Sequence, residues 1–417
     1  MTRRARTGRP AVGDPYGTGL LGTVLAPALA VVGLLVVAIV TLNLFNGELP
    51  FGIGGGPTGN GNGANGPDRT AAPSNVVIPE DEADFLGSIL YVKAGNVWIQ
   101  DAENGPRQLS RSGHDSMASF SPDGAWVYYI QTEERRGYWP VRGRPGWWDM
   151  EVPHLKRIRA DGSMDRPEEL ATGRFREGRF DWFSWMRQPV LSPNGTTVAM
   201  VTDQPDPNDR SVVLQLYDLE DEDFTVPDVP VTDPLGHQDP EWRADGRMLL
   251  YVRNGRDGTQ GAPVIWRYDT REREAAAITT PGYLEPSYSP DGRYIAATRT
   301  SPLGTDVVIL HGTRGTELLR VTNDGKSWGP VWSPAGDAVA FLRMDGQSVD
   351  LYLARLTGPA GSWTVEETIA LTDVSGLDAA STPDWFIPPE ELPAPTAPPS
   401  APPTTAPNPS ASASSGP

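Results

Sequence analysis

The chain has 417 residues, no cysteine and a formal net charge of −18. The acidic balance argues against a nucleic-acid partner, because phosphate binding needs a basic face. The lack of cysteine excludes a disulfide framework, a thiolate metal site and a lipid-modified cysteine.

The N-terminal part predicts a membrane anchor. Residues 1–19 carry several arginines, and residues 20–45 are apolar and uncharged, long enough for a helix to cross a bilayer of about 30 Å. Arginine before the span and Glu48 after it place residues 1–19 in the cytoplasm and the rest outside. A cleaved signal peptide, cut after Ala30, is the alternative. The apolar run continues well past that point, which favours an uncleaved single-pass anchor in the cell membrane.

Two low-complexity segments flank the middle of the chain. Residues 46–84 are rich in Gly, Asn and Pro and are expected to form a flexible tether. Residues 389–417 are rich in Pro, Ser, Ala and Thr and cannot bury a core, so we expect a disordered tail. That tail could thread the cell wall, carry glycans or be inert.

Residues 85–388 contain a repeated turn. Each copy has a large residue, then Ser-Pro-Asp-Gly or a close variant, then a run of β-branched and aromatic residues. Proline, Asp or Asn, and glycine suit successive positions of a tight turn between two strands. The glycines that close the five turns lie 71, 51, 46 and 44 residues apart, at Gly124, Gly195, Gly246, Gly292 and Gly336. A period of about 40–50 residues built from strands predicts the blades of a β-propeller.

The ends of this region predict how the ring closes. Phe85 to Val92 and Asn96 to Asp101 are typical of the second and third strands of a blade, but no inner strand precedes them. Pro383-Asp384-Trp385 matches an inner strand that has no hairpin partner after it. Trp385 is therefore expected to pair beside Leu90 and Tyr91 in a composite closing blade, which leaves no free edge. The fold class predicted is all-β, a six-bladed β-propeller preceded by one transmembrane helix.

The repeats resemble a known family. The repeats follow the form apolar-x-Ser-Pro-Asp-Gly-x-x-apolar with variants, and Leu-Thr or Val-Thr and a Pro-x-Trp come before some of them. Examples are Val321-Thr322 before Pro330-Val331-Trp332 and Leu371-Thr372 before Pro383-Asp384-Trp385. These features are similar to the WD40-like PD40 repeats of TolB-type propellers. The resemblance implies the fold over residues 85–388. It does not imply one activity, because such blades occur in binding proteins and in propellers attached to enzymes.

Two local patterns suggest chemistry but fit structural roles better. Gly325-Lys326-Ser327-Trp328-Gly329 matches Gly-x-Ser-x-Gly, yet it lies between two strands and no histidine follows His311. The acidic run from Asp218 to Asp223 lacks the spacing and glycine of a calcium loop. We therefore predict an interblade loop and a solvated turn, and expect no enzyme activity, cofactor or metal.

Polar residues before two inner strands could meet near the ring axis. They are His114, Asp115, His237 and Asp239. Two histidines on separate blades are a weak metal signal, so polar groups around the channel mouth are the expectation.

Two long connections contain most of the unusual side chains. One is an insertion over residues 132–153, and the other joins the next two blades over residues 172–188. In a propeller both emerge on the same face, so their aromatic and arginine residues should cluster. They either pack on each other to order the excursion or form a contact surface. The candidate surface is Arg135, Arg136, Tyr138, Trp139, Trp147, Trp148, Phe180, Trp182 and Trp185.

Together these features predict a non-enzymatic, membrane-anchored module outside the cytoplasm that binds or scaffolds another envelope protein. Two alternatives remain open. One is a protein that binds, and possibly processes, cell-wall or extracellular glycans through the Trp-rich face. Cleavage would need a carboxylate pair that the sequence does not identify. The other is a regulatory sensor coupled to a membrane partner.

Overall fold

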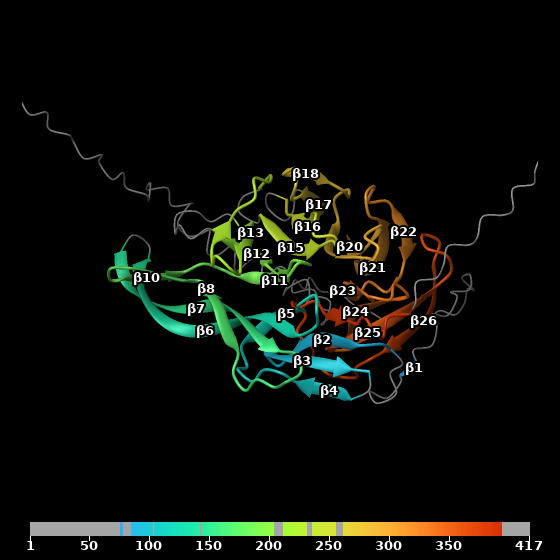
Figure 1. Ribbon diagram of the computed structural model, residues 1–417, viewed down its shortest axis with the longest axis horizontal. Helices are drawn as coiled ribbons and strands as arrows, with labels where there is room; N and C mark the ends of the chain where they lie inside the picture. Colours follow the sequence, from blue (N-terminus) through green and yellow to red (C-terminus); the bar gives the residue numbers. More distant parts are fainter. Residues whose placement is uncertain are drawn as a thin grey trace, which may run out of the picture.

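The computed structural model describes residues 76–77, 85–102, 104–141, 144–203, 212–231, 236–255 and 262–393. Every regular element in these ranges is a β-strand. Six sheets form the blades of a propeller, and their inner strands, among them β5, β11, β15 and β23, surround the middle of the ring (Figure 1). The all-β six-bladed propeller predicted from the repeats is confirmed.

The first three blades each have four strands, which follow one another from the ring axis outward. Blade 1 contains β27 (Asp384–Phe386), β2 (Ser88–Lys93), β3 (Asn96–Asp101) and β4 (Gly105–Gln108). Blade 2 contains β5 (Asp115–Phe120), β6 (Trp126–Val141), β7 (Arg144–Arg159) and β8 (Glu168–Thr172). Blade 3 contains β11 (Arg187–Leu191), β12 (Thr197–Asp203), β13 (Val212–Asp218) and β14 (Phe224–Thr225).

The other three blades follow the same order. Blade 4 contains β15 (His237–Trp242), β16 (Met248–Arg253), β17 (Val264–Asp269) and β18 (Glu274–Ala277). Blade 5 contains β19 (Tyr283–Tyr288), β20 (Tyr294–Ser301), β21 (Gly304–His311) and β22 (Glu317–Arg320). Blade 6 contains β23 (Ser327–Trp332), β24 (Ala338–Asp345), β25 (Ser348–Thr357) and β26 (Thr364–Ala370). A separate hairpin, β9 (Arg174–Glu177) with β10 (Phe180–Phe183), lies between blades 2 and 3.

The repeated motif forms the turn between the two innermost strands of a blade. In blade 2 the amide of Gly124 donates to the Ser121 carbonyl at 2.8 Å, and Gly124 adopts a φ of 66°. The Ser121 hydroxyl accepts from the amide of Trp126 at 2.9 Å, which starts the next strand. The buried runs that follow these turns pack between neighbouring blades. Leu90 and Ile99 of blade 1, for example, share one core cluster with residues of blade 2.

The composite closing blade is present. The strand β27 pairs antiparallel with β2, and the register places Trp385 opposite Ile89 and Asp384 opposite Leu90. This register differs by one residue along β2 from the pairing that the sequence predicts. The buried indole of Trp385 also donates to the carbonyl of Leu86 at 2.8 Å. The ring is thus closed by the last strand of the propeller against the first.

A short strand, β1 (Val76–Val77), lies within the segment expected to be a tether. It pairs in parallel with β26, with Val76 opposite Ile369. The tether is therefore fixed to the outer edge of blade 6 at these two residues. Residues 1–75 and 394–417, which include the predicted transmembrane span and most of the tail, lie outside the described residues.

The two faces of the ring differ. We name the side on which the motif turns lie the turn face, and the side on which the inner strands begin the hairpin face. Ser88 pairs with Phe386, and the Phe386 ring packs against Gly124, so the propeller begins and ends at the turn face. The long excursion of blade 2 leaves from the opposite, hairpin face.

Candidate functional site

Blade 2 carries a hairpin that projects beyond the ring. The pairing of β5 with β6 stops at Asp115 opposite Gln131, and β8 pairs with β7 only up to His154. The strands β6 and β7 nevertheless remain paired along their whole length. Residues 132–141 and 144–153 therefore form a two-stranded ribbon, which we name the projecting hairpin, at the end of the molecule that carries β10 (Figure 1).

The small β9–β10 hairpin packs against this ribbon. The amide of Gly173 donates to the Pro153 carbonyl at 2.8 Å, which ties the start of β9 to the ribbon. Within the small hairpin, Arg174 Nε donates to the Asp181 carboxylate at 2.9 Å, and this ion pair holds the two strands together. The long insertion and the interblade connection thus lie on one face, as the strand order predicts.

Most of the predicted aromatic residues pack against each other between the two hairpins. The ring centroids of Trp139 and Trp182 are 4.8 Å apart, and those of Trp148 and Phe183 are 5.7 Å apart and stacked. Such contacts stabilise a fold beyond the area they bury. We name this group the aromatic seam: Tyr138, Trp139, Trp148, Phe175, Phe180, Trp182 and Phe183. For these residues the geometry favours internal packing over direct contact with a partner.

Two tryptophans at the margin of the seam face solvent. Trp147 is 64% exposed and touches Tyr138 edge-on, and Trp185 is 39% exposed. The Arg136 guanidinium lies 6.0 Å from the centre of the Trp147 ring. Arg135, in contrast, forms an ion pair with Glu133 at 2.8 Å. A large exposed aromatic beside an arginine is the composition of a binding hot spot.

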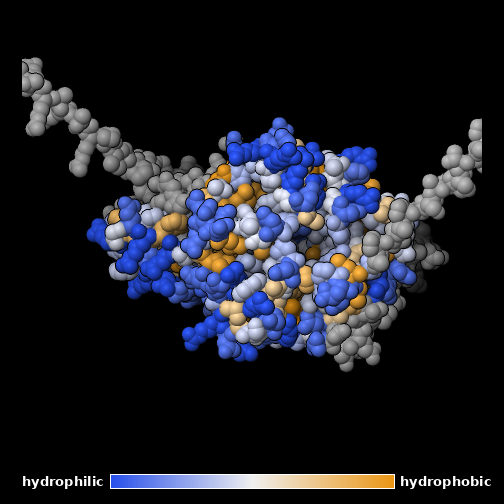
Figure 2. All heavy atoms as spheres, viewed as in Figure 1, coloured by the Kyte–Doolittle hydropathy of each residue, from blue (hydrophilic) through white to orange (hydrophobic). Residues whose placement is uncertain are grey.

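A cavity of about 790 Å³ lies between the base of the projecting hairpin and the ring. Its walls come from the hairpin, the interblade connection and the first residues of the inner strands of blades 2 and 3. Trp148, Phe183 and Trp185 provide aromatic surface, and Met117 and Arg187 close it toward the ring axis. Figure 2 shows hydrophobic atoms gathered on the visible face between the hairpin end of the molecule and the ring.

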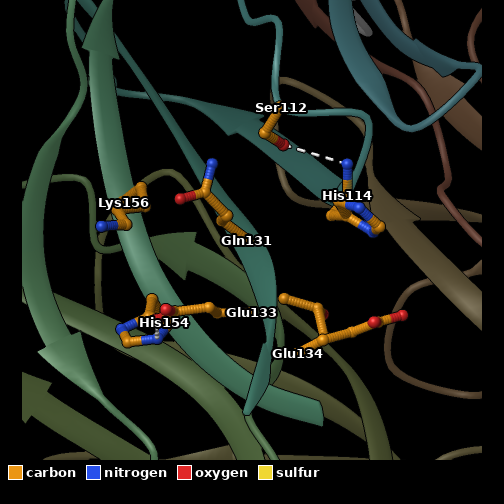
Figure 3. A pocket seen from close by; sticks show the side chains of 8 residues that line it. Ser112, His114, Gln131, Glu133, Glu134, His154 and Lys156 are labelled. Atoms are coloured by element: carbon orange, nitrogen blue, oxygen red, sulfur yellow. Dashed lines mark hydrogen bonds and ion pairs between the residues drawn. The ribbon is translucent and has the colours of Figure 1, made fainter.

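A smaller pocket of about 330 Å³ lies at the base of the same hairpin, beside the connection that carries Ser112 and His114. Figure 3 shows the rings of His114 and His154 on opposite sides of it, with Glu133 next to His154. The buried His154 ring lies 3.2 Å from Glu169 and 3.4 Å from Glu133. Burial lowers the pKa of His154, while the two carboxylates oppose that shift. The two carboxylates flank the ring, and neither ring nitrogen forms a hydrogen bond.

The four residues predicted at the channel mouth do not converge. His114 is exposed, and Asp115 is buried and accepts from the Gln131 amide at 2.9 Å. The buried His237 ring accepts at Nδ1 from the Leu214 amide at 3.0 Å, so it links strands of blades 3 and 4. Of these four residues, only Asp239 takes part in the hydrogen bonds that join inner strands around the channel. Among the described residues no group of three His, Cys, Asp or Glu side chains could hold a metal ion.

Five of the six inner strands have a β-bulge at the same place. The bulge residue adopts a left-handed conformation, with φ between 51° and 60°, seven residues before the turn glycine. These residues are Met117, Gln188, Asp239, Glu285 and Gly329. Left-handed backbone costs energy for residues other than glycine, so it persists only where other contacts hold it.

Hydrogen bonds between these bulges provide that support. Gln188 Oε1 accepts from the amide of Asp239 at 2.9 Å, and Asp239 Oδ2 accepts from the amide of Glu285 at 3.0 Å. Glu285 Oε2 in turn accepts from the amide of Gly329 at 2.8 Å. A second layer of hydrogen bonds between blades lies further along the inner strands; in blade 4 its acceptor is two residues after the bulge. There Glu241 accepts from the amide of Tyr288 at 3.2 Å, and Asp384 from that of Phe120 at 2.7 Å.

Four carboxyl groups in these two layers have raised pKa values. Burial, with a contribution from the charge of Asp384, raises the pKa of Glu241 to about 8. Burial raises the pKa of Asp384 to about 6. Burial also raises the pKa values of Asp239 and Glu285, and in Glu285 the neighbouring Asp239 charge adds to the effect. Sequence reasoning missed Glu241, Glu285 and Asp384 as buried carboxyls, although all three lie on inner strands that the repeats had located.

The Gly-x-Ser-x-Gly pattern at residues 325–329 and the acidic run at residues 218–223 have structural roles. Ser327 is fully buried, and its hydroxyl donates to the Asp324 carboxylate at 3.0 Å. Asp218 accepts from the amides of Glu220 and Asp221 at 2.8 and 3.0 Å, which closes a turn. Neither geometry presents a free nucleophile or a chelating loop.

No family model matches the chain. The uncharacterized protein Atu1656 of Agrobacterium fabrum is 28% identical over 169 residues, which are 38% of this chain and 47% of that protein. The lasso peptide isopeptidase AtxE2 of Asticcacaulis excentricus is 30% identical over 131 residues, which are 25% of this chain and 18% of that protein. The chain thus matches about half the length of one curated relative and under a fifth of the other.

Solved structures agree with the architecture. TolB from Acinetobacter baumannii superposes with a TM-score of 0.52 at 17% identity, over 73% of this chain and 67% of that one. A protein of Agrobacterium tumefaciens provisionally assigned to TolB superposes with a TM-score of 0.50 at 16% identity, over 74% of this chain and 96% of that one. At this level of identity the likeness shows the fold alone. By fold, the chain is a TolB-like β-propeller.

A search of the described residues for a helix of membrane-spanning length and apolarity finds none. The predicted span at residues 20–45 lies outside those residues.

Proposed function

We propose that the chain is a non-enzymatic, protein-binding module of the cell envelope, anchored by residues 20–45. The observation that carries this proposal is the exposed Trp147 at the margin of the aromatic seam, with Arg136 beside it. The seam orders a projecting ribbon that the propeller does not need for closure, and the ribbon presents a bulky apolar ring to solvent. Exposed surface of this kind is typical of sites that a partner covers.

The arrangement of the two faces supports the same proposal. The first strand of blade 1 along the chain, β2, begins on the turn face, where Ser88 pairs with Phe386. The projecting hairpin leaves from the opposite face. A membrane tether attached before residue 85 would leave the hairpin face free to meet a partner.

A binding role is favoured over an enzymatic one because the side chains that could act in catalysis already contact other residues of the fold. Ser327 donates to Asp324, and His154 is held between Glu133 and Glu169. The carboxyl groups of Glu241 and Asp384, whose pKa values are raised, accept hydrogen bonds from the backbone of the next blade. These contacts are internal to the fold and Ser327 is fully buried, so we assign structural roles to these groups.

Site-specific photocrosslinking tests the binding surface. A photoreactive residue at position 147 should crosslink to one discrete envelope protein in intact cells. The matched control is position 313, an exposed threonine in the β21–β22 turn on the turn face, which should give no such adduct. Equal adducts at both positions, or none at 147, would contradict the proposal. An adduct whose added mass is carbohydrate would instead support the glycan alternative.

Topology is tested separately. A reporter enzyme that is active only outside the cytoplasm should be active when fused after Pro417, because the arginines of residues 1–19 precede the span. Reporter activity only in the cytoplasm, or release of the shortened protein into the medium, would overturn the anchored arrangement while leaving the binding surface open.

A further inference from the structure

The 790 Å³ cavity contains a guanidinium with free donors. Arg187, the first residue of β11, lines the cavity and lies 5.9 Å from the centre of the Trp185 ring. Among the described residues its guanidinium forms no hydrogen bond or ion pair. Asp239 interacts with it electrostatically, but the Asp239 carboxylate is hydrogen-bonded to the Gln188 side chain and the Glu285 amide. The five N–H donors of Arg187 are therefore available to a ligand.

The two other arginines that line the cavity differ from Arg187. Arg135 pairs with Glu133 at 2.8 Å, and the exposed Arg136 lies 6.0 Å from the centre of the Trp147 ring. Arg187 instead sits among apolar walls, where burial lowers its pKa because the charged form is poorly solvated. A carboxylate is the partner whose two oxygens match the planar fork of a guanidinium, and it would offset that desolvation.

The walls next to Arg187 are apolar and adaptable. Phe183 and Trp185 supply aromatic surface, and Met117, Met150 and Met186 supply thioether side chains that adjust to different shapes. The indole nitrogen of Trp148, another lining residue, is buried without a hydrogen-bond partner. The site therefore combines a cation, one further free donor and an apolar wall. It fits a carboxylate attached directly to an apolar group.

The rim of the cavity restricts what else the ligand can carry. Its exposed charged residues are Glu134, Asp149 and Glu151, with Arg135 and Arg136 of the opposite sign. Three carboxylates against two guanidinium groups give a polyanion such as an acidic glycan no net attraction, whereas a neutral chain can pass. A cavity of several hundred Å³ holds a ligand of a few residues.

We propose that this cavity binds the C-terminal residue of a peptide chain. The terminal carboxylate binds Arg187, the apolar side chain of the last residue packs on Phe183 and Trp185, and the preceding residues leave past the charged rim. The inference deepens the proposed protein-binding function, since it places the end of a partner chain at the base of the projecting hairpin. It concerns a surface separate from Trp147, which does not line the cavity.

The test uses the full-length chain and two matched sets of acetylated tripeptides that end in Leu or Phe. One set has free C-terminal carboxylates and the other has C-terminal amides. Calorimetric titration should show binding of the acids and at least tenfold weaker binding of the amides. Arg187→Met should weaken acid binding by at least tenfold, and Arg187→Lys by less. Arg293→Met, at an exposed arginine on the turn face, should leave binding unchanged.

Three outcomes would overturn the proposal: no binding of the acids, equal binding of acids and amides, or unchanged binding by Arg187→Met. If Arg187→Met does not fold, the comparison of acids with amides on the unmodified chain still decides. Failure here with intact crosslinking at position 147 would reject the cavity site alone. Loss of the crosslink with intact peptide binding would reject only the contact surface around Trp147.

Discussion

Glu241 and Asp384 lie on blades 4 and 1, at opposite positions of the six-bladed ring, yet the charge of Asp384 raises the pKa of Glu241. The charge of Asp384 therefore acts on Glu241 from the opposite blade. Each also accepts a hydrogen bond from the backbone of the next blade, at Tyr288 and Phe120. These hydrogen bonds join neighbouring blades around the channel. The stability of the propeller therefore depends on whether the two carboxyl groups are protonated.

The first prediction concerns pH. In the unfolded chain a glutamate titrates near pH 4, whereas in the folded chain Glu241 titrates at about 8. Its contribution to stability is complete below about pH 4 and is lost as pH rises toward 8, because the unfolded chain ionises first. The slope cannot exceed about 1.4 kcal/mol per pH unit for one proton. Glu241→Gln keeps an acceptor for Tyr288 and should flatten the fall in urea midpoints between pH 5 and 8.

Other groups titrate in the same range and must be subtracted. Asp239, Glu285 and Asp384 also have raised pKa values and lower stability with the same sign as Glu241. Burial lowers the pKa values of His154 and His237, so their effect on stability has the opposite sign. The difference between the parent chain and Glu241→Gln isolates the carboxyl. Parallel stability curves from pH 5 to 9 would show that Glu241 is ionised in the folded protein.

The second prediction separates the two adjacent tryptophans of the projecting hairpin. Trp148→Ala removes a ring stacked on Phe183 and should lower the free energy of unfolding by about 3 kcal/mol. Trp147→Ala removes a ring that is 64% exposed and should cost less than about 1 kcal/mol. Chemical denaturation of both variants gives the comparison. A large loss in Trp147→Ala would mean that this ring is part of the packing and not a contact surface.

The third prediction concerns ring closure. A chain that ends after Gly376 lacks β27 and therefore the buried Trp385, so the propeller should lose its cooperative unfolding transition as a whole. A chain that ends after Pro393 keeps β27 and should melt within a few degrees of the full chain. Calorimetry measures both. An unchanged transition after the shorter truncation would mean that β27 does not close the ring.

The fourth prediction uses two glycines with similar backbone and different surroundings. Gly124 and Gly195 have φ of 66° and 76° in equivalent turns. A Cβ at Gly195 meets nothing within 4 Å, so Gly195→Ala should cost only the left-handed backbone, about 1 kcal/mol. A Cβ at Gly124 would lie 2.1 Å from the Phe386 ring.

Gly124→Ala should therefore destabilise by clearly more than Gly195→Ala, because Phe386 in the closing strand must move. Double substitution with Phe386→Ala tests the cause, since it should remove most of the extra cost of the alanine. Equal costs for Gly124→Ala and Gly195→Ala would show that the ring of Phe386 moves away without penalty.

Local sequence was sufficient for the repeat because each motif specifies its own turn. Ser121 and Gly124 need only their immediate neighbours to form a hairpin, so the number of blades and the closing strand could be predicted. The grouping of the two Trp-rich segments also followed, since strand order in a propeller decides from which face a connection leaves.

Which tryptophan is packed and which is exposed was decided by tertiary structure. Trp147 and Trp148 are adjacent and chemically identical, but the alternation of a strand points one ring to solvent and the other onto Phe183. The same limit applies to the channel. Met117, Gln188, Asp239 and Glu285 differ in type, and only the closed ring shows that their equivalent bulges meet the next blade.

The sequence by itself determined the blades and the side of the ring on which the long connections lie, because turns and strand order depend on contacts close along the chain. Tertiary structure alone decided the cavity beside Arg187 and the electrostatic interaction of Asp384 with Glu241. Residues 241 and 384 are close enough to interact only after the blades between them have completed the ring. The closed ring buries both carboxyl groups and so raises their pKa values, which neither segment could do alone.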